Sequence, residues 1–428
     1  MAETLLLTGA KQLVTMAGPA PRRGRGLGDV GAVADGAVLV AGGRIVAAGP
    51  RAKVERHAAA KRARKMDVGG RVVTPGLVDA HTHLVFAASR AAEYEQRIAG
   101  ATYEQIAKAG GGILSSVRAL REAPDEALVA GARGRLARMA AHGTTTAEAK
   151  TGYGLDFDNE LRTLKVLQRL GREQKVEIVP TLLAAHVVPP EFRGEKSGAD
   201  EYVDRIVRLI LPAAALEGLA EYCDVFVERG AFTVAQARRV MAAARALGLK
   251  PRLHAEQLGR MGGARLAVEV EAASVDHLDY VNAADIRALA QSEVACILLP
   301  GCSFHLGLGR YAPARKLIEA GAIVALATDC NPGTSPTMSL PMAMSIACTQ
   351  MRMTPGEALA ACTVNAAYSL GRSARIGSAE AGKDADLAVW DVEDYREIPY
   401  YFGVNHCAMT MKRGAMIWQA EMGRKMPT

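Results

Sequence analysis

The feature that most constrains the fold is a regular alternation of short apolar runs and helical stretches from Val72 onward. Eight such runs are predicted to be buried strands: 77–83, 144–150, 177–186, 223–228, 251–256, 274–279, 293–300 and 322–329. Helical periodicity predicts helices between them at 160–171, 203–211, 234–247, 262–271, 283–291 and 314–320. Eight strand–helix units over about 300 residues are what a (β/α)8 TIM barrel, an α/β fold, requires. A doubly wound open sheet is the alternative, but no glycine-rich dinucleotide fingerprint follows the first strand.

The two ends of the chain have a different pattern. Residues 1–71 contain short strands with Gly-rich turns, including a hairpin signal at 37–47, and residues 52–64 have the pattern of a charged surface helix. After about residue 371, a turn and a strand follow at 382–391. We therefore predict that 1–71 and 372–428 form one small β-sandwich domain from both termini, and that 72–371 form the catalytic barrel.

Composition argues against several classes of protein. The net charge of +7 comes partly from basic clusters at 22–25 and 61–65, but neither contains aromatic residues. Stacking platforms for bases are therefore absent, and we expect no nucleic-acid partner. No apolar run reaches about 18 residues and the N-terminus has no basic region, so we expect neither a membrane span nor a secretory signal. Seven scattered cysteines are typical of reduced thiols in the cytoplasm.

Five of the nine histidines lie at the carboxyl ends of the predicted strands: His81, His83, His186, His254 and His277. Because side chains alternate faces along a strand, His81 and His83 are expected to point to the same side. Catalytic groups of a barrel come from the carboxyl ends of several strands. Chance would scatter histidines over helices and loops as well, so this placement predicts a metal site.

The eighth strand ends in Asp329, which completes a set of four possible ligands. Three imidazoles and one carboxylate, from His81, His83, His254 and Asp329, would hold one Zn²⁺, Fe²⁺ or Fe³⁺ ion with an open position for water. A turn or capping role is the alternative for Asp329, and a hydrogen-bonded core histidine is the alternative for His254.

The remaining two histidines are interpreted differently. His186 and His277 are better assigned as non-ligands that reach the substrate or carry protons. A catalytic metal lowers the pKa of bound water from 15.7 to about 7. At about 1.36 kcal/mol per pKa unit this is on the order of 12 kcal/mol, so hydrolysis is the favoured reaction class.

Several motifs carry a family resemblance. The segment PGLVDAHTH at 75–83, the distant Asp329 and the terminal GKDADLAVWD resemble the amidohydrolase superfamily, which joins a metal-bearing barrel to a small sandwich. The motifs HTHLVF, GGGI, EAKTGYGL, HAEQL, SVDHLDY, ATDCNPGTSP and FGVN resemble the members that open an imidazolone ring in histidine degradation. The resemblance implies hydrolysis of the cyclic amide of 4-imidazolone-5-propanoate to N-formimidoyl-L-glutamate.

The resemblance also implies a role for each matching residue. His81, His83, His254 and Asp329 would be the metal ligands, His277 and Asp329 would share proton transfer, and Arg90, Tyr153, His186, Gln257, Asn331, Gly333 and Thr334 would surround the substrate. An anionic substrate needs a fixed cation, and Arg90 lies just past the first strand. We further expect a homodimer.

Alternatives remain open for these residues and for the reaction. Arg90 can form a surface salt bridge, Tyr153 can pack as a core aromatic, and 331–334 can be a plain turn. Position 257 is a glutamine, so it is not expected to be the sole general base. The second hypothesis for function is an aminohydrolase, or deaminase, that acts on another nitrogen heterocycle with the same metal site.

Overall fold

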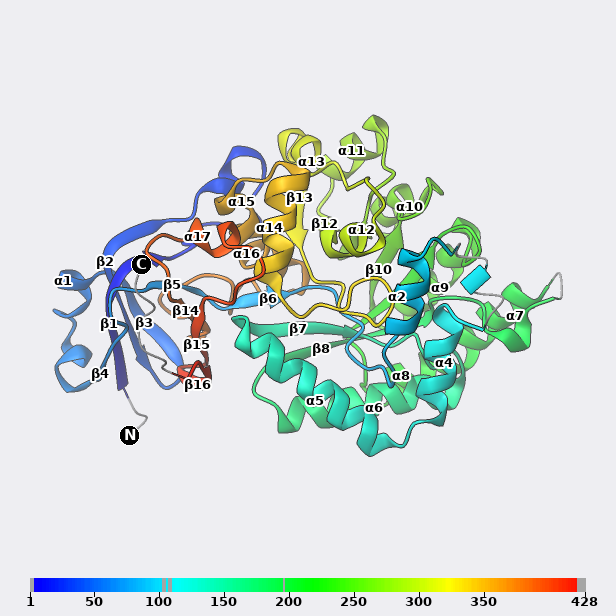
Figure 1. Cartoon of the computed structure of the whole chain (residues 1–428), viewed down its shortest axis with the longest axis horizontal. Helices are drawn as coiled ribbons and strands as arrows, with labels where there is room; N and C mark the ends of the chain where they lie inside the picture. The colour runs from blue at the N-terminus through cyan, green and yellow to red at the C-terminus, as the bar shows by residue number, and fades with distance from the viewer. Residues whose placement is uncertain (1–3, 102–104, 107–109, 195–196, 422–428) are drawn as a thin grey trace.

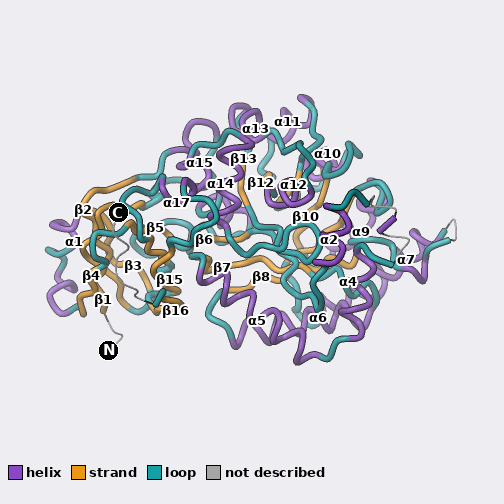
Figure 2. Tube along the Cα trace, in the orientation of Figure 1, coloured by secondary structure: helices purple, strands orange, loops and turns teal. Residues whose placement is uncertain are grey.

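The chain forms a large barrel ringed by helices and a smaller sheet domain beside it (Figures 1 and 2). The computed structural model describes residues 4–101, 105–106, 110–194 and 197–421. The first and last described strands, β1 (Thr4–Val14) and β16 (Ala415–Gln419), both lie in the smaller domain. None of the described helices is long and apolar enough to cross a membrane.

The barrel consists of eight parallel strands that pair in chain order. They are β6 (Leu77–Asp79), β7 (Thr144–Lys150), β8 (Glu177–Ala185), β9 (Tyr222–Val227), β10 (Lys250–Ala255), β11 (Ser274–His277), β12 (Ala295–Leu298) and β13 (Ile323–Leu326). Each coincides with one of the eight predicted runs, so the predicted fold class is confirmed. Among the described residues, the bridge that joins the first and last strands and closes the barrel is the parallel one between Thr82 and Cys330.

Helices cover the outside of the barrel (Figure 1), except for the helix at Val364–Ser369, which packs against inward-facing residues of the strands. They are α2 (Ala91–Ile98), α4 (Ile113–Glu122), α5 (Asp125–Ala141), α6 (Phe157–Glu173), α7 (Gly198–Arg205), η4 (Ile206–Ile210), α8 (Leu211–Leu216), α9 (Val234–Ala246), α10 (Gly263–Glu269), α11 (Ala283–Ala290), α12 (Pro300–Leu306), α13 (Ala314–Ala320), α14 (Leu340–Met351), α15 (Pro355–Ala361) and α16 (Val364–Ser369). Short helical turns elsewhere are η1 (Gly24–Gly28), η3 (Pro190–Phe192) and α17 (Glu397–Tyr400).

Helix α6 illustrates why these segments are helical. Leu161, Leu164, Leu167 and Leu170 recur every three residues, and all four are buried against the barrel. The side chain of Asp156 caps the first turn by accepting a hydrogen bond of 2.7 Å from the Asn159 N–H group. The buried stripe and the cap together fix both the face and the start of this helix.

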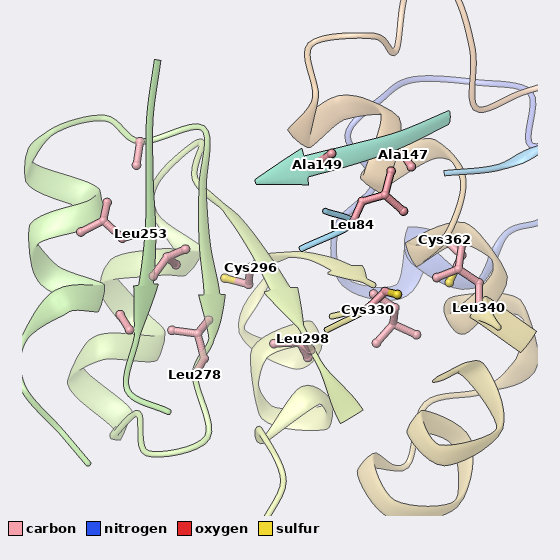
Figure 3. Packing of buried hydrophobic residues seen from close by; sticks show 14 of the residues in the cluster. Leu84, Ala147, Ala149, Leu253, Leu278, Cys296, Leu298, Cys330, Leu340 and Cys362 are labelled. Atoms are coloured by element: carbon pink, nitrogen blue, oxygen red, sulfur yellow. The ribbon is translucent and has the colours of Figure 1, made fainter. Parts of the chain in front are cut away.

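The barrel strands alternate between two environments. Outward residues such as Ala147, Leu253 and Leu298 join the main apolar cluster beneath the helices, part of which is shown in Figure 3. Inward apolar residues such as Ile297 and Ala325 form a separate cluster with α16. A parallel barrel buries both faces of each strand, which explains why the runs were nearly continuous in the sequence.

The smaller domain is one mixed sheet built from both ends of the chain. Its strand order is β16-β15-β14-β5-β1-β2-β3, and β4 also pairs with β1. The remaining bounds are β2 (Ala32–Ala41), β3 (Arg44–Pro50), β4 (Arg64–Asp67), β5 (Val72–Pro75), β14 (Leu387–Trp390) and β15 (Cys407–Lys412). Strand β5 pairs with β1 and β14 rather than with the barrel, so the barrel begins at Leu77 and not at residue 72.

The predicted surface helix at 52–64 is wrong. Helix α1 (Arg51–Val54) ends after one turn, η2 (Ala58–Arg62) follows, and β4 begins at Arg64. Only Val54 and Ala60 are buried in the two helical pieces, which is too little apolar contact to hold a longer helix. The His57 ring instead accepts a hydrogen bond of 3.2 Å from the Ala59 N–H group and starts η2.

A buried lysine joins the two domains. The Nζ atom of Lys412 on β15 lies 2.7 Å from Asp386 Oδ2 and 3.0 Å from Glu177 Oε2, at the start of β8. It also donates a hydrogen bond of 3.1 Å to Thr146 Oγ1. All seven cysteines are free thiols in the structure.

Candidate active site

The histidine pair of the first strand lies where the barrel closes. Strand β6 ends at Asp79, and the chain continues in an irregular extended segment whose Thr82 forms the bridge to Cys330. On either side of that bridge, Asp329 N donates to His81 O at 3.1 Å and His83 N donates to Cys330 O at 2.9 Å. Barrel closure therefore brings His81, His83 and Asp329 together, although about 250 residues separate them in the sequence.

Three pairs of atoms among the four predicted ligands have the separation that a shared ion requires. Asp329 Oδ1 lies 3.5 Å from both His81 Nε2 and His83 Nε2. His83 Nε2 lies 3.4 Å from His254 Nε2. A tetrahedral ion with ligand bonds of about 2.0–2.2 Å separates its ligands by roughly 3.3–3.6 Å. The described residues therefore form a site suited to one divalent metal ion.

A hydrogen bond behind the His81 ring and a carboxylate close behind the His254 ring support the same conclusion. His81 Nδ1 lies 2.6 Å from Asp276 Oδ2, and His254 Nδ1 lies 3.1 Å from Asp224 Oδ2. A ring that donates from Nδ1 to a carboxylate has a lone pair on Nε2. His81 Nε2 is buried and has no hydrogen-bond partner among the described residues. Lone pairs that face one another across about 3.5 Å are stabilised by a cation between them.

Burial shifts the pKa values of the possible metal ligands toward their neutral forms. It raises the pKa of the Asp329 carboxyl to about 7 and holds the pKa values of His81 and His83 well below 6.5. Neutral imidazole is the form that binds metal. A cation among these groups favours the ionised carboxylate of Asp329, which offsets the cost of burying it.

His186 and Tyr153 border the donor set on one side. The His186 ring stacks on His83 with centroids 5.1 Å apart and planes 15° apart, and Tyr153 lies 5.9 Å from His83. His186 Nδ1 is 2.9 Å from Gly152 O, and burial lowers the pKa of this histidine to about 3. Gly152 has a φ of +108°, and a Cβ atom there would lie 2.8 Å from His186 Nδ1. This position therefore requires glycine.

Arg90 lies beside the turn at 331–334. Its Nε and Nη2 atoms both donate to Glu93 Oε2, at 2.9 and 2.6 Å, so the guanidinium is held in place. A Cβ atom on Gly333 would lie 2.0 Å from Arg90 Nη1, so the two residues are in close contact. The N–H groups of Gly333 and Thr334 both donate to Asn331 Oδ1, at 2.9 and 2.7 Å. Asn331 therefore shapes the turn, and its carboxamide oxygen already accepts hydrogen bonds from these two N–H groups.

His277 lies beside two of the donors, and His81, His254 and His277 form a further group whose ligand atoms lie within 4.8 Å of one another. The His277 ring is 5.8 Å from His81 and 5.4 Å from His254. Gln257 Nε2 lies 3.4 Å from Cys302 Sγ. Glu256, His277, Leu278 and Asp329 all have positive φ angles, between 54° and 78°. Non-glycine residues in this conformation cluster at functional sites, where the surrounding structure holds them.

Sequence reasoning missed a layer of buried charges below the histidines. It consists of Glu148, Lys150, Asp224, Arg252 and Asp276, all fully buried. Burial opposes the charge of Lys150, but Asp224 and Glu148 outweigh it and raise its pKa above 10.5. A signal was present, because each of these charges interrupts an otherwise apolar strand.

The fold, the donor set and the sequence agree on one class of protein. The family model described as "Amidohydrolase family" matches residues 72–417. The chain therefore belongs to the amidohydrolase family, and it is a hydrolase. An adenosine deaminase from Xanthomonas campestris with bound zinc is similar in structure, with a TM-score of 0.68, 20% identity and coverage of 98% of this chain and 94% of that one. A mutant of the atrazine chlorohydrolase from Arthrobacter aurescens, in complex with zinc and atraton, has a TM-score of 0.66, 17% identity and coverage of 97% and 95%.

Curated relatives define the branch more narrowly. An imidazolonepropionase from Solibacter usitatus is 50% identical over 404 residues, which cover 94% of this chain and 96% of the relative. One from Geobacillus kaustophilus is 47% identical over 417 residues, which cover 96% and 97%. Within the amidohydrolases, the chain belongs to the imidazolonepropionase family.

Proposed function

We propose that this chain hydrolyses the ring amide of 4-imidazolone-5-propanoate and releases N-formimidoyl-L-glutamate, a step of histidine degradation. The observation that carries the proposal is the near full-length similarity to proteins named imidazolonepropionase, at 44–50% identity. The geometry of the site agrees with the proposal. The mouth of the barrel holds both a set of possible metal ligands and the guanidinium group of Arg90, which Glu93 keeps in place. Barrel enzymes bind their substrates at the carboxyl ends of the barrel strands, which is where these groups lie.

The metal of this site is proposed to be Zn²⁺ or an iron ion. His81, His83, His254 and Asp329 would hold it, and nitrogen and carboxylate ligands suit both metals. When bound, it would act as a Lewis acid on the ring carbonyl and make a water molecule more acidic. Elemental analysis of the purified protein distinguishes the two metals.

The residues around the metal site are proposed to orient the ring and move protons. Arg90, fixed by Glu93, would pair with the propionate carboxylate of the substrate. Tyr153 and His186 would hold the ring next to His83. His277, whose Nδ1 atom is buried without a partner among the described residues, would exchange a proton with the reacting amide, and Asp329 would share this transfer.

A two-substrate assay tests the proposed reaction. Purified protein is incubated with 4-imidazolone-5-propanoate and, separately, with aminated heterocycles such as adenosine or cytosine. Loss of imidazolonepropionate with formation of N-formimidoyl-L-glutamate is the expected result. Release of ammonia from an aminated heterocycle without opening of the imidazolone ring would instead establish an aminohydrolase.

Replacement of Gly333 by alanine tests the role of Arg90. The new Cβ atom would lie 2.0 Å from Arg90 Nη1, so the guanidinium must move away from its position. A hydrogen bond to a charged group contributes about 1.5–3 kcal/mol, so KM is expected to rise by roughly 10- to 150-fold. The value of kcat should change much less, because the metal donors are not touched. Steady-state kinetics measure both values.

Gly134→Ala is the matched control. Gly134 lies in α5, and nothing lies within 4 Å of a Cβ atom placed on it. This variant should keep the wild-type KM and become slightly more stable, because alanine is the better helix former. An unchanged KM in Gly333→Ala would show that Arg90 does not bind the propionate group.

A further inference from the structure

The strongest unexplained feature is the buried ammonium group of Lys150, which lies below the metal-type donors. Its Nζ atom is 2.7 Å from Glu148 Oε1, 2.7 Å from Asp224 Oδ2 and 3.5 Å from Asp276 Oδ2. Lys150 and all three acids are completely buried. Burying a charge is expensive, and a core of similar volume could have been filled with apolar side chains instead. Such a cluster inside a barrel therefore calls for a specific role.

Two of the three acids that surround Lys150 touch the predicted metal ligands. Asp276 Oδ2 lies 2.6 Å from His81 Nδ1, and Asp224 Oδ2 lies 3.1 Å from His254 Nδ1. In each pair, the carboxylate contacts the ring nitrogen that faces away from the donor set. The contact with His81 is a hydrogen bond, which fixes the orientation of that ring and places its lone pair on Nε2. Asp224 lies at ion-pair distance from the His254 ring and accepts a hydrogen bond of 3.2 Å from the His254 backbone N–H group, which holds the segment that carries the ring.

The third acid holds the backbone between the first two histidines. Glu148 Oε2 accepts a hydrogen bond of 3.2 Å from the N–H group of Thr82, and the Thr82 hydroxyl donates to Glu148 O at 2.6 Å. Thr82 separates His81 from His83 and forms the bridge that closes the barrel. Lys150 thus contacts three acids that each hold a different part of the donor set: Asp276 holds His81, Asp224 holds His254, and Glu148 holds the 81–83 segment.

The remaining cation of this layer does not have the same connections. Arg252 donates to Ala80 O at 2.9 Å and to Ser369 O at 3.4 Å, and its Nε atom lies 3.8 Å from Glu148 Oε1. In the described part of the chain Arg252 therefore forms no hydrogen bond with Asp224 or Asp276, although its charge acts on both. Without Lys150, these two acids would face each other with no cation in hydrogen-bond range.

We propose that Lys150 is a positioning residue of the metal site: through Asp224, Asp276 and Glu148 it sets the orientation of His81, His254 and the 81–83 segment. Lys150 itself touches neither metal nor substrate. Its removal leaves like-charged carboxylates close together, so they rotate apart and the rings that they hold turn with them. This inference rests on the metal site of the proposed function, but not on the identity of the substrate.

A zinc titration of folded variants tests this role. Lys150→Met keeps the length of the side chain and removes its charge. Loss of groups that orient metal ligands typically costs 10- to 100-fold in metal affinity, so the Kd for Zn²⁺, measured by competition with a chelating indicator, should rise by that factor. Circular dichroism and thermal melting verify that the variant is folded.

Lys412→Met is the matched control. Lys412 is also a buried lysine between two carboxylates, Glu177 and Asp386. Its hydrogen bonds with described residues go to these two acids and to Thr146, and not to a histidine. Its loss should lower the melting temperature while the Kd for Zn²⁺ stays within about twofold of wild type, because the ligand rings keep their partners. A general effect of removing a buried charge would instead weaken zinc binding equally in both variants, and this would overturn the proposal.

Asp276→Asn supplies a second test if Lys150→Met does not fold. The carboxamide keeps the shape of the side chain but weakens its contacts with Lys150 and His81. A 10- to 100-fold higher Kd for Zn²⁺ is again expected. Wild-type affinity in a folded Lys150→Met or Asp276→Asn protein would overturn the positioning role alone. Wild-type protein that takes up no zinc would overturn the metal site as well.

Discussion

Replacement of His83 by alanine is expected to lower turnover of the imidazolone substrate by at least about 10⁴-fold and to release the metal. His83 Nε2 faces both Asp329 Oδ1 and His254 Nε2 at about 3.4–3.5 Å, so its loss removes one corner of the donor set. The metal accounts for the largest part of the expected rate enhancement, on the order of 12 kcal/mol as judged from the acidity of bound water. Turnover and metal content are measured on the same sample.

His142→Ala is the control for the loss of a histidine. His142 follows helix α5, and it is not among the residues that face the donor set. This variant should retain its metal and its turnover. Chelation of wild-type protein should reproduce the effect of His83→Ala, and added zinc or iron should restore activity only in the wild type. Full activity after exhaustive chelation would refute the metal-dependent mechanism.

Replacement of His277 should lower kcat by about 10²–10⁴-fold while the metal stays bound. The His277 ring lies 5.4 Å from His254 and 5.8 Å from His81, close enough to reach a substrate held at the metal site. Positioned proton transfer is the contribution lost with the ring. The metal content of the variant should equal that of the wild type, which separates this effect from that of His83.

The backbone at His277 determines which variant is informative. Its φ angle is +78°, a region that alanine adopts only with strain. Asparagine tolerates positive φ better than alanine, so His277→Asn removes the imidazole with less disturbance of the backbone. A large loss of kcat in both variants supports proton transfer by His277. Near-normal turnover in His277→Asn would exclude that role, and a loss confined to His277→Ala would assign the effect to the backbone.

The barrel could be predicted from the sequence because its strands are buried on both faces. Runs such as those at 144–150 and 251–256 are short, apolar and bounded by helical stretches, and they coincide with β7 and β10. The helix predicted at 52–64 was wrong for the opposite reason, namely that few of its residues are buried. Its alanines and charges favour a helix locally, but only Val54 and Ala60 find a buried face, and His57 interrupts the helix.

The boundary between the domains could not be predicted from the local sequence either. Val72–Pro75 is as apolar as the barrel strand that follows it, and its sequence gives no reason to separate the two. The hydrogen bonds of β5 with β1 and β14 assign it to the smaller sheet. Strand pairing over several hundred residues is a property of the tertiary structure, because backbone groups carry no sequence label.

The sequence by itself determined the class of fold, the histidines at strand ends and the reaction class that such residues favour. Those features follow from local periodicity and from the chemistry of individual side chains. Only the tertiary structure decided which charges lie behind which histidines, because Lys150, Asp224 and Asp276 come from three strands and meet inside the barrel. A single strand shows which of its residues point inward, but their partners depend on how the neighbouring strands are aligned when the barrel closes.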